Sequence, residues 1–329
     1  MPFKALITGA TGFIGSHLLE TLVSQKWEVT CLLRSSSRTD FLKKFPVEIV
    51  QGSLENQSLL ERAVEGQDYI FHLAGRIQSA PREVYEKSNH KLTRDLVYAC
   101  LRTNPDIKRF VYISSIAAAG PSRPGQHSEE AQIPSPESEY GRTKLKGEKA
   151  VQEVWEQIPA TIIRPPNVYG PRQLETELLI KLIQKRIVPI LKSKKKSTSL
   201  IYVKDLIRGI LQAAESPNTQ GQIYYLTDRE SYSWREIIFT IKKYVLREAF
   251  FLPLPEEIIS FFAWVSDIIK ATGIIRLFFG QRAWKAMIHT QWLFSSSKAE
   301  KDFGFKPRYN LDAGIRDMLG VRLEKIGKL

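Results

Sequence analysis

The chain has 329 residues, of which 43% are hydrophobic and 25% charged, a balance that is typical of globular proteins and excludes a disordered chain. The formal net charge of +13 at pH 7 is spread over many segments without a zinc-finger, RNA-recognition or leucine-zipper motif, so we expect no nucleic-acid partner. The 2 cysteines exclude a disulfide framework, and no His/Asp/Glu cluster has the spacing of metal ligands, so we expect no metal.

Strand-like and helix-like segments alternate along the first half of the chain. Short β-rich segments that are apolar on both faces, as in strands buried between helix layers, lie at residues 4–8, 28–33, 47–51, 69–73, 110–114 and 161–164. Amphipathic segments typical of helices lie between them, at residues 13–24, 58–64, 83–102 and 139–156. This alternation predicts an α/β fold with a Rossmann-type, doubly wound parallel sheet.

The pattern changes after Pro165, where a loop rich in Pro, Gly and Asn leads into denser helical segments. We predict a dinucleotide-binding domain of residues 1–170, to which residues 200–227 return. Residues 171–199 and 228–329 are expected to form a smaller, mainly helical substrate lobe. Aromatic residues of this lobe form either its core or a wall for a flat or lipid-like substrate: Phe261, Phe262, Trp264, Phe278, Phe279 and Trp284.

Targeting and surface features are sparse. No charged-then-apolar leader precedes the first strand, and the longest apolar run, residues 258–269, is interrupted by Asp267 and is too short to span a bilayer. We therefore expect a cytoplasmic protein without a transmembrane segment. A basic cluster indicates either an exposed hairpin tip or a contact with an anionic substrate or a membrane surface: Lys192, Lys194, Lys195 and Lys196.

The first strand ends in a glycine-rich turn, which a helix follows at once: Thr8-Gly9-Ala10-Thr11-Gly12-Phe13-Ile14-Gly15. Gly9 permits a tight turn with positive φ, Gly12 lets the backbone approach a pyrophosphate, and Gly15 lets the helix pack close to the strand. The N–H groups of the helix start and its positive dipole end then face the phosphates. In this strand–turn–helix context, the turn predicts a dinucleotide site.

The end of the second strand bears on the choice between NADP and NAD. An NAD site usually places Asp or Glu here, where the carboxylate accepts hydrogen bonds from the adenosine ribose. This chain instead has Arg34, three serines and Arg38. A guanidinium group suits a 2′-phosphate because its fork matches the phosphate oxygens. We therefore predict that NADP is the preferred cofactor. The alternative is NAD, and Arg34 would then be an ordinary solvated charge on a loop.

Tyr140 and Lys144 lie four residues apart at the start of a predicted helix, so their side chains share one helical face. Lowering the pKa of a phenol from about 10 to about 7 requires roughly 4 kcal/mol of preferential stabilisation of the phenolate. A lysine ammonium and a positive nicotinamide ring can supply that. Upstream, the fifth strand ends in Ser114-Ser115. Because successive side chains alternate at a strand end, Ser114 should point away from the side that Ser115 faces.

Taken in order, these motifs resemble those of the extended short-chain dehydrogenase/reductase superfamily, which contains the NAD-dependent epimerase/dehydratase family. The resemblance covers essentially the whole chain. Further matching segments are Phe71-His72-Leu73-Ala74-Gly75, Asn89, Arg164-Pro165-Pro166-Asn167-Val168-Tyr169-Gly170-Pro171, Tyr202-Val203-Lys204-Asp205-Leu206 and residues 297–307. The run from Ser114 to Pro121 and Arg164-Pro165-Pro166 look closest to the 3β-hydroxysteroid dehydrogenase and dihydroflavonol reductase branch.

The resemblance implies roles for individual residues. Tyr140 would be the general acid/base, Lys144 would bind the nicotinamide ribose and lower the tyrosine pKa, and Ser115 would hydrogen-bond the reacting oxygen. Asn89 would give structural support. The expected cofactor contacts are Gly9, Thr11, Gly12, Phe13, Ile14, Gly15, Arg34, Arg38, Ser53, Leu54, Leu73, Ala74, Gly75, Asn89, Tyr140, Lys144, Pro165 and Val168. One departure is Ser53, because the family often has an Asp there that touches adenine; that contact is weakened or replaced.

Three functions share these residues. The preferred one is an NAD(P)-dependent oxidoreductase that moves a hydride between nicotinamide and a carbonyl or secondary alcohol. The first alternative is a nucleotide-sugar epimerase or dehydratase that recycles NAD, although Ala119 stands where sugar epimerases often have tyrosine. The second is a non-catalytic dinucleotide-binding scaffold or redox sensor. The substrate is a small molecule, either apolar and flat or a sugar nucleotide. A homodimer is compatible with the resemblance. His72 is expected to be a hydrogen-bonded core residue rather than a catalyst.

Overall fold

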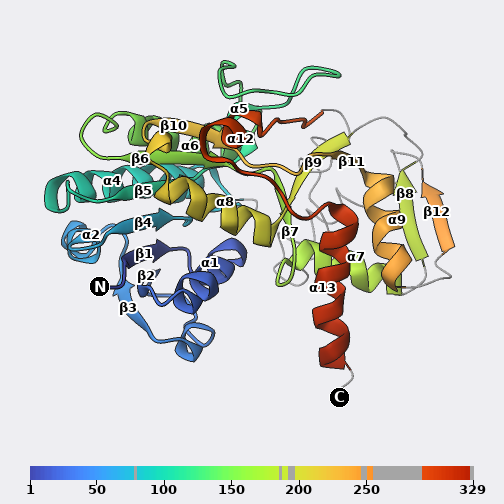
Figure 1. Ribbon diagram of the computed structural model, residues 1–329, viewed down its shortest axis with the longest axis horizontal. Coiled ribbons are helices and arrows are strands. Elements are labelled where there is room, and N and C mark those ends of the chain that lie inside the picture. The colour runs from blue at the N-terminus through green and yellow to red at the C-terminus, as the bar shows by residue number, and fades with distance from the viewer. Residues whose placement is uncertain (78–79, 185–186, 192–196, 246–249, 255–290, 327–329) are drawn as a thin grey trace.

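The computed structural model describes residues 1–77, 80–184, 187–191, 197–245, 250–254 and 291–326. Its centre is a seven-stranded parallel sheet in the order β10-β6-β5-β4-β1-β2-β3 (Figure 1). The strand order reverses between β1 and β4, which is the position where open α/β sheets bind their ligands, at the carboxyl ends of the strands. The strands are β1 (Lys4–Thr8), β2 (Glu28–Arg34), β3 (Val47–Gly52), β4 (Tyr69–His72), β5 (Arg109–Ile113), β6 (Ala160–Arg164) and β10 (Gln222–Tyr225).

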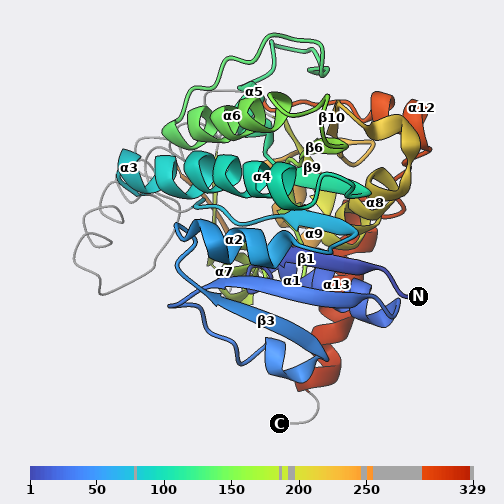
Figure 2. The ribbon, with the colours of Figure 1, turned by 90° about the vertical axis from the view of Figure 1, so that its left-hand side faces the viewer.

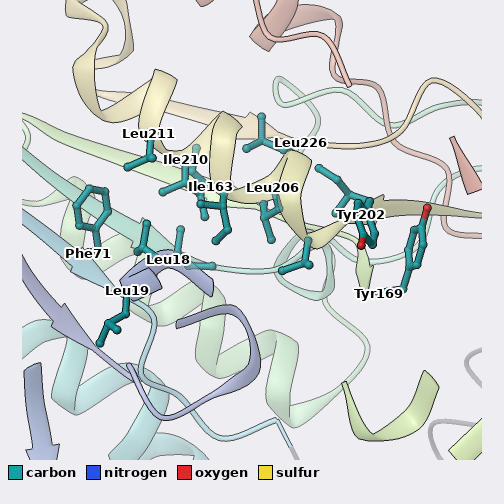
Figure 3. Close-up of a cluster of buried hydrophobic side chains, with 14 of the residues drawn as sticks. Leu18, Leu19, Phe71, Ile163, Tyr169, Tyr202, Leu206, Ile210, Leu211 and Leu226 are labelled. Atoms are coloured by element: carbon teal, nitrogen blue, oxygen red, sulfur yellow. The ribbon is translucent and has the colours of Figure 1, made fainter. Parts of the chain in front are cut away.

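Alternate side chains of the strands enter two apolar cores, one on each face of the sheet. Ala5 and Ile7 of β1 share a core with α1 (Phe13–Ser24) and α8 (Val203–Glu215), and Figure 3 shows part of it. Leu6 of β1 enters the opposite core with the remaining sheet-flanking helices, which Figure 2 shows side by side: α2 (Gln57–Val64), α4 (Leu92–Thr103) and α6 (Glu139–Gln152). Burial on both faces explains why the inner strands β1, β4, β5 and β6 are mainly apolar.

A second lobe lies beside the carboxyl ends of the sheet strands, on the right of Figure 1. In it, β9 pairs in parallel with β7 and antiparallel with β11, while β8 and β12 form a separate pair. Its elements are β7 (Asn167–Tyr169), α7 (Leu174–Gln184), β8 (Ile187–Leu191), β9 (Ser197–Tyr202), β11 (Ser231–Ser233), α9 (Trp234–Val245), β12 (Phe250–Leu254) and α13 (Leu311–Ile326). Shorter helices are η1 (Leu42–Lys44), α5 (Ile116–Ala119), η3 (Pro217–Thr219) and α12 (Ser297–Phe303).

The predicted fold class, a doubly wound α/β sheet, is confirmed, but one detail differs. The helix expected at residues 83–102 is divided into α3 (Arg82–Tyr85), a π-helical turn η2 (Glu86–Lys91) and α4. Residues 200–202 belong to β9, which pairs with β7, and β10 extends the main sheet beside β6. The division of the chain into two domains stays a prediction.

Two sequence features lie outside the described residues, so their interpretation stays a prediction. They are the lobe's aromatic residues from Phe261 to Trp284, with His289, and the basic cluster from Lys192 to Lys196. None of the helices in the described part of the chain has the length and apolarity of a bilayer-spanning segment. In that same part, no three His, Cys, Asp or Glu residues gather as metal ligands would.

Candidate active site

The glycine turn joins β1 to α1 in the conformation that a phosphate-binding turn requires. Gly9 has φ of +78°, and the N–H of Gly12 donates to its carbonyl oxygen at 2.9 Å. A Cβ on Gly15 would lie 2.2 Å from the Gly9 oxygen, so only glycine lets α1 start this close to the strand. Among the described residues, no side chain caps α1, and its first turn holds no acidic residue. These features fit a diphosphate at the helix start.

The other turn residues expected to contact the cofactor lie around this helix start. Thr11 and Gly12 are exposed, whereas Phe13 and Ile14 are half-buried and pack against the core beneath α1. The exposed backbone is the part that a ligand can approach. The structure therefore brings together the turn residues that the sequence singled out, with Thr11 and Gly12 outermost.

Arg34 ends β2 at the same edge of the sheet, and Arg38 follows in the loop; both are exposed. Gln51 braces this loop, because its side-chain amide nitrogen lies 3.0–3.3 Å from the carbonyl oxygens of Arg34, Ser35 and Ser37. Sequence reasoning missed Gln51, since an exposed glutamine near a strand end gives no distinctive pattern. The residues from Arg34 to Arg38 thus bring two guanidinium groups, and neither Asp nor Glu, to the end of β2.

Ser53 and Leu54 follow β3, whose Gly52 pairs with Arg34. Ser53 is exposed and its hydroxyl accepts a hydrogen bond from the Glu55 N–H at 3.3 Å. Leu54 is half-buried and packs against the core that contains α2. Both residues thus lie beside the loop that carries Arg34.

His72 organises the residues that follow β4. The Ala74 N–H donates to the Thr8 hydroxyl at 3.1 Å, which lies 2.6 Å from His72 Nδ1, and His72 Nε2 lies 2.9 Å from the Thr93 hydroxyl. Because the Thr93 hydroxyl donates to a backbone carbonyl, its oxygen accepts from Nε2–H, and Nδ1 accepts from Thr8. Burial lowers the pKa of His72 to about 3. The prediction of a hydrogen-bonded core histidine is confirmed.

Asn89 connects the segment after β4 to α6. Its side chain accepts from the Arg76 N–H at 2.7 Å and donates to the Arg76 carbonyl at 3.1 Å and to the Thr143 hydroxyl at 3.2 Å. It lies in the π-helical turn η2, and such turns recur at functional sites. A Cβ on the exposed Gly75 would lie 2.9 Å from the Asn89 side-chain oxygen, so glycine lets the backbone next to Ala74 pass close to Asn89.

Tyr140, Ser115 and Lys144 converge where β5 ends. The hydroxyls of Tyr140 and Ser115 are hydrogen-bonded. Lys144 is only 3% exposed; its ammonium group donates to the Ile113 carbonyl at 2.6 Å and lies 4.2 Å from the centre of the Tyr112 ring. A Cβ on Gly75 would come within 4.0 Å of the Lys144 nitrogen, so the segment after β4 reaches the same place.

Ser114 faces the opposite side, as predicted. It is buried and its hydroxyl donates to Glu148 at 2.5 Å. Pro165, which follows β6, borders the same region because the Ile116 N–H donates to the Pro165 carbonyl at 3.1 Å. Val168, on β7, packs against the core that contains α1 and α8. Pro165 is buried and Val168 is half-buried.

Burial dominates the electrostatics of the pair. It raises the pKa of Tyr140 to about 12 against the lowering effect of the Ser115 hydrogen bond. It lowers the pKa of Lys144 to about 7, against the raising effect of the nearby Glu148 carboxylate. In the chain by itself burial therefore outweighs any lowering of the tyrosine pKa, and the lowering expected from Lys144 together with a nicotinamide ring stays a prediction. At neutral pH, Tyr140 is a neutral phenol, the form that donates a proton.

Residues 5–226 match the sequence profile of the NAD dependent epimerase/dehydratase family. The chain belongs to this family. The resemblance to the extended short-chain dehydrogenase/reductase superfamily is thereby confirmed, as is membership of a family of NAD-dependent enzymes.

Relatives of this family member include proteins named as reductases and a dehydrogenase. It is 29% identical over 294 residues to a ceramide reductase of Caulobacter vibrioides, with 88% of this chain and 86% of the relative covered. It is 28% identical to a putative dihydroflavonol 4-reductase of Synechocystis sp., with 80% and 79% covered. It is 26% identical to a decarboxylating sterol-4-alpha-carboxylate 3-dehydrogenase of Dictyostelium discoideum, with 96% and 99% covered.

The fold of this family member is also shared with solved structures. One is a UDP-glucuronic acid 4-epimerase from Bacillus cereus in complex with NAD, which has a TM-score of 0.77 and 23% identity and covers 98% of this chain and 99% of its own. At this identity the likeness concerns the fold alone.

Proposed function

We propose that the chain is an NADP-dependent oxidoreductase that interconverts a carbonyl and a secondary alcohol of a small apolar molecule, with Tyr140 as the general acid/base. The single observation that carries the proposal is the convergence of Tyr140, Ser115 and the buried Lys144 ammonium group at the end of β5, beside Gly75. This set can bind a carbonyl oxygen with two hydroxyls and deliver a proton to it.

The chain's own residues would divide the work as follows. The Gly9–Gly15 turn would bind the diphosphate, while Lys144 would bind the ribose beside the nicotinamide. Ala74, Gly75, Pro165 and Val168 would border the ring. When bound, the nicotinamide supplies or accepts the hydride. Ser115 would orient the substrate oxygen, and Tyr140 would donate its proton to that oxygen on reduction or remove it on oxidation.

The preference for NADP over NAD rests on Arg34 and Arg38. Both guanidinium groups are exposed at the end of β2. An Asp or Glu at this position would repel a 2′-phosphate and would accept hydrogen bonds from the ribose hydroxyls of NAD, whereas a guanidinium group binds the phosphate. The brace that Gln51 supplies to the loop carbonyls supports a preformed loop. NADPH is accordingly the cofactor expected to give the lower KM.

The choice of an apolar substrate is supported by an apolar cluster that begins at Ile116, next to Ser115. In it Ala119 and Trp292 pack against the buried residues Ile116, Tyr225 and Phe294, and apolar surroundings favour an apolar substrate over a sugar. The relatives named as ceramide reductase, dihydroflavonol reductase and sterol dehydrogenase agree with such a substrate. We also propose that residues 171–199 and 228–329 form the substrate lobe.

The test is incubation of the purified protein with NADPH or NADH and a panel of apolar ketones and aldehydes. Oxidation of NADPH at a kcat/KM about tenfold or more above that of NADH supports the proposal. Isomerisation of a UDP-sugar without net cofactor oxidation would instead assign the epimerase function. Tight cofactor binding without either activity would assign a scaffold or sensor.

A further inference from the structure

Behind Tyr140 and Lys144 lies a buried polar cluster that the proposed chemistry does not use. Arg164 donates from Nε to Oε1 of Glu148 at 2.9 Å and from Nη2 to Oε2 at 2.6 Å, which makes a two-pronged ion pair. Ser114 donates to the same carboxylate, and Arg164 also donates from Nη1 to the Tyr225 hydroxyl at 3.1 Å. The side chains of Glu148 and Arg164 are each 1% exposed.

The ion pair joins three elements that each carry a proposed site residue. Glu148 lies one helical turn after Lys144 on α6. Ser114 directly precedes Ser115 at the end of β5, and Arg164 directly precedes Pro165 at the end of β6. A two-pronged guanidinium–carboxylate pair fixes orientation as well as distance, so it sets how these three elements meet.

Stability alone explains this pair poorly. Removing two charges from water is so costly that apolar replacements of a buried ion pair are often neutral or stabilising. Closely packed backbone already holds α6 in place, because a Cβ on Gly147 would come within 2.6 Å of the Asn89 carbonyl oxygen. The pair is therefore better explained by what it does for its neighbours.

Glu148 is the acidic group that acts on Lys144. In the described part of the chain, the ammonium group also contacts the Tyr112 ring and the Ile113 carbonyl of β5. His72 of β4 is neutral at working pH, because its pKa is about 3. Arg164 of β6 is bound to both oxygens of the Glu148 carboxylate. Burial lowers the pKa of Lys144 to about 7, and Glu148 opposes this effect.

We propose that Glu148, locked by Arg164, is a positioning residue of this site: it fixes α6 against the ends of β5 and β6 and holds its negative charge one helical turn from Lys144. The inference rests on the proposed function, in which Lys144 acts as a cation. The effect of Glu148 on the titration of Lys144 can also be measured in the absence of turnover.

The primary experiment follows the titration of Lys144 by NMR in full-length protein labelled with 13C-lysine, the resonance being assigned by its loss in Lys144→Met. Glu148→Gln should lower the titration midpoint by about one pH unit, since a nearby negative charge is lost. Glu148→Asp keeps the charge and should restore much of the wild-type midpoint. An unchanged midpoint in Glu148→Gln would overturn the proposal.

The kinetic arm uses the cofactor and ketone that the panel identifies. With midpoints near 7 in wild type and near 6 in the variant, about half of the variant's Lys144 is charged at pH 6, whereas at pH 8 its charged fraction is about tenfold smaller than that of wild type. The activity of Glu148→Gln relative to wild type should therefore be several-fold higher at pH 6 than at pH 8. An equal loss at both pH values would mean that Glu148 is merely structural and would overturn the proposal.

A double variant separates an effect on folding from an effect on the position and charge of Lys144. Glu148→Met/Arg164→Met removes both charges together and should fold with a Tm near or above that of wild type. It should still show the lowered Lys144 midpoint and a kcat at pH 8 at least tenfold below wild type. A folded double variant with wild-type midpoint and kcat would refute the inference.

The matched control is Asp205→Asn in α8, since Asp205 is 1% exposed and is paired with Arg208. It should lower the Tm without moving the Lys144 midpoint. A shift of the Lys144 midpoint in this control would show that a loss of stability alone is enough to move the midpoint, and it would refute the role of Glu148. If wild type turns over no substrate with either cofactor, the proposed function fails. The NMR titrations still show whether Glu148 raises the titration midpoint of Lys144.

Discussion

Lys144, for which we propose a role in cofactor binding, is buried at a cost in stability. An ordinary lysine holds its proton up to a pKa of about 10.4, yet burial lowers that of Lys144 to about 7. Between pH 7 and 10 the unfolded chain therefore binds more protons at this position than the folded chain does. Stability rises with pH through that window, and below pH 7 the full cost of the buried charge is present.

We therefore expect Lys144→Met to be more stable than wild type at pH 6 to 7, on the order of 2 kcal/mol in the free energy of unfolding. The gap should shrink as the pH rises toward 10. Urea unfolding across pH 6 to 10 measures it, with Lys149→Met, at an exposed position of the same helix, as control. A variant less stable than wild type at pH 6 would contradict the argument.

At the scale of elements, the sequence predicted those parts whose pattern is local. Buried strands appear as apolar runs, and the Gly9–Gly15 turn depends on glycine where a Cβ would collide with backbone. The π-helical turn η2 left no visible trace, because one extra residue in a helix barely disturbs its apolar periodicity. The brace that Gln51 supplies was also missed, since its partners are backbone carbonyls that no side-chain pattern reveals.

Gln51→Met should weaken NADPH binding selectively. The substitution keeps the length of the side chain but removes the amide that holds the Arg34–Ser37 loop. Loss of hydrogen bonds worth about 1 kcal/mol predicts a KM for NADPH about fivefold higher, and a KM for NADH within about twofold of wild type. Steady-state kinetics with both cofactors measures this, with Gln57→Met on α2 as control. An equal rise for both cofactors would contradict a role in reading the 2′-phosphate.

At the scale of the whole molecule, the candidate site draws on residues far apart in the chain. Its cofactor half was predictable, because Tyr140 and Lys144 lie on one helix and the glycine turn is contiguous. The ion pair between Glu148 and Arg164 was not, since neither residue shows its partner and the two meet only through the packing of α6 on β6. The lobe was less predictable still, because β7 and β9 pair across about thirty residues of intervening chain.

The fate of Tyr140→Phe tests the central claim most directly. Phe keeps the ring near Tyr85, whose centre lies 6.3 Å away, and removes only the hydroxyl. On the substrate that the panel identifies, kcat should fall by about 10²- to 10⁴-fold, as for loss of a general acid. The Kd for NADPH should stay within about threefold, and Tyr98→Phe on α4 should keep wild-type turnover. Wild-type turnover by Tyr140→Phe would contradict the account.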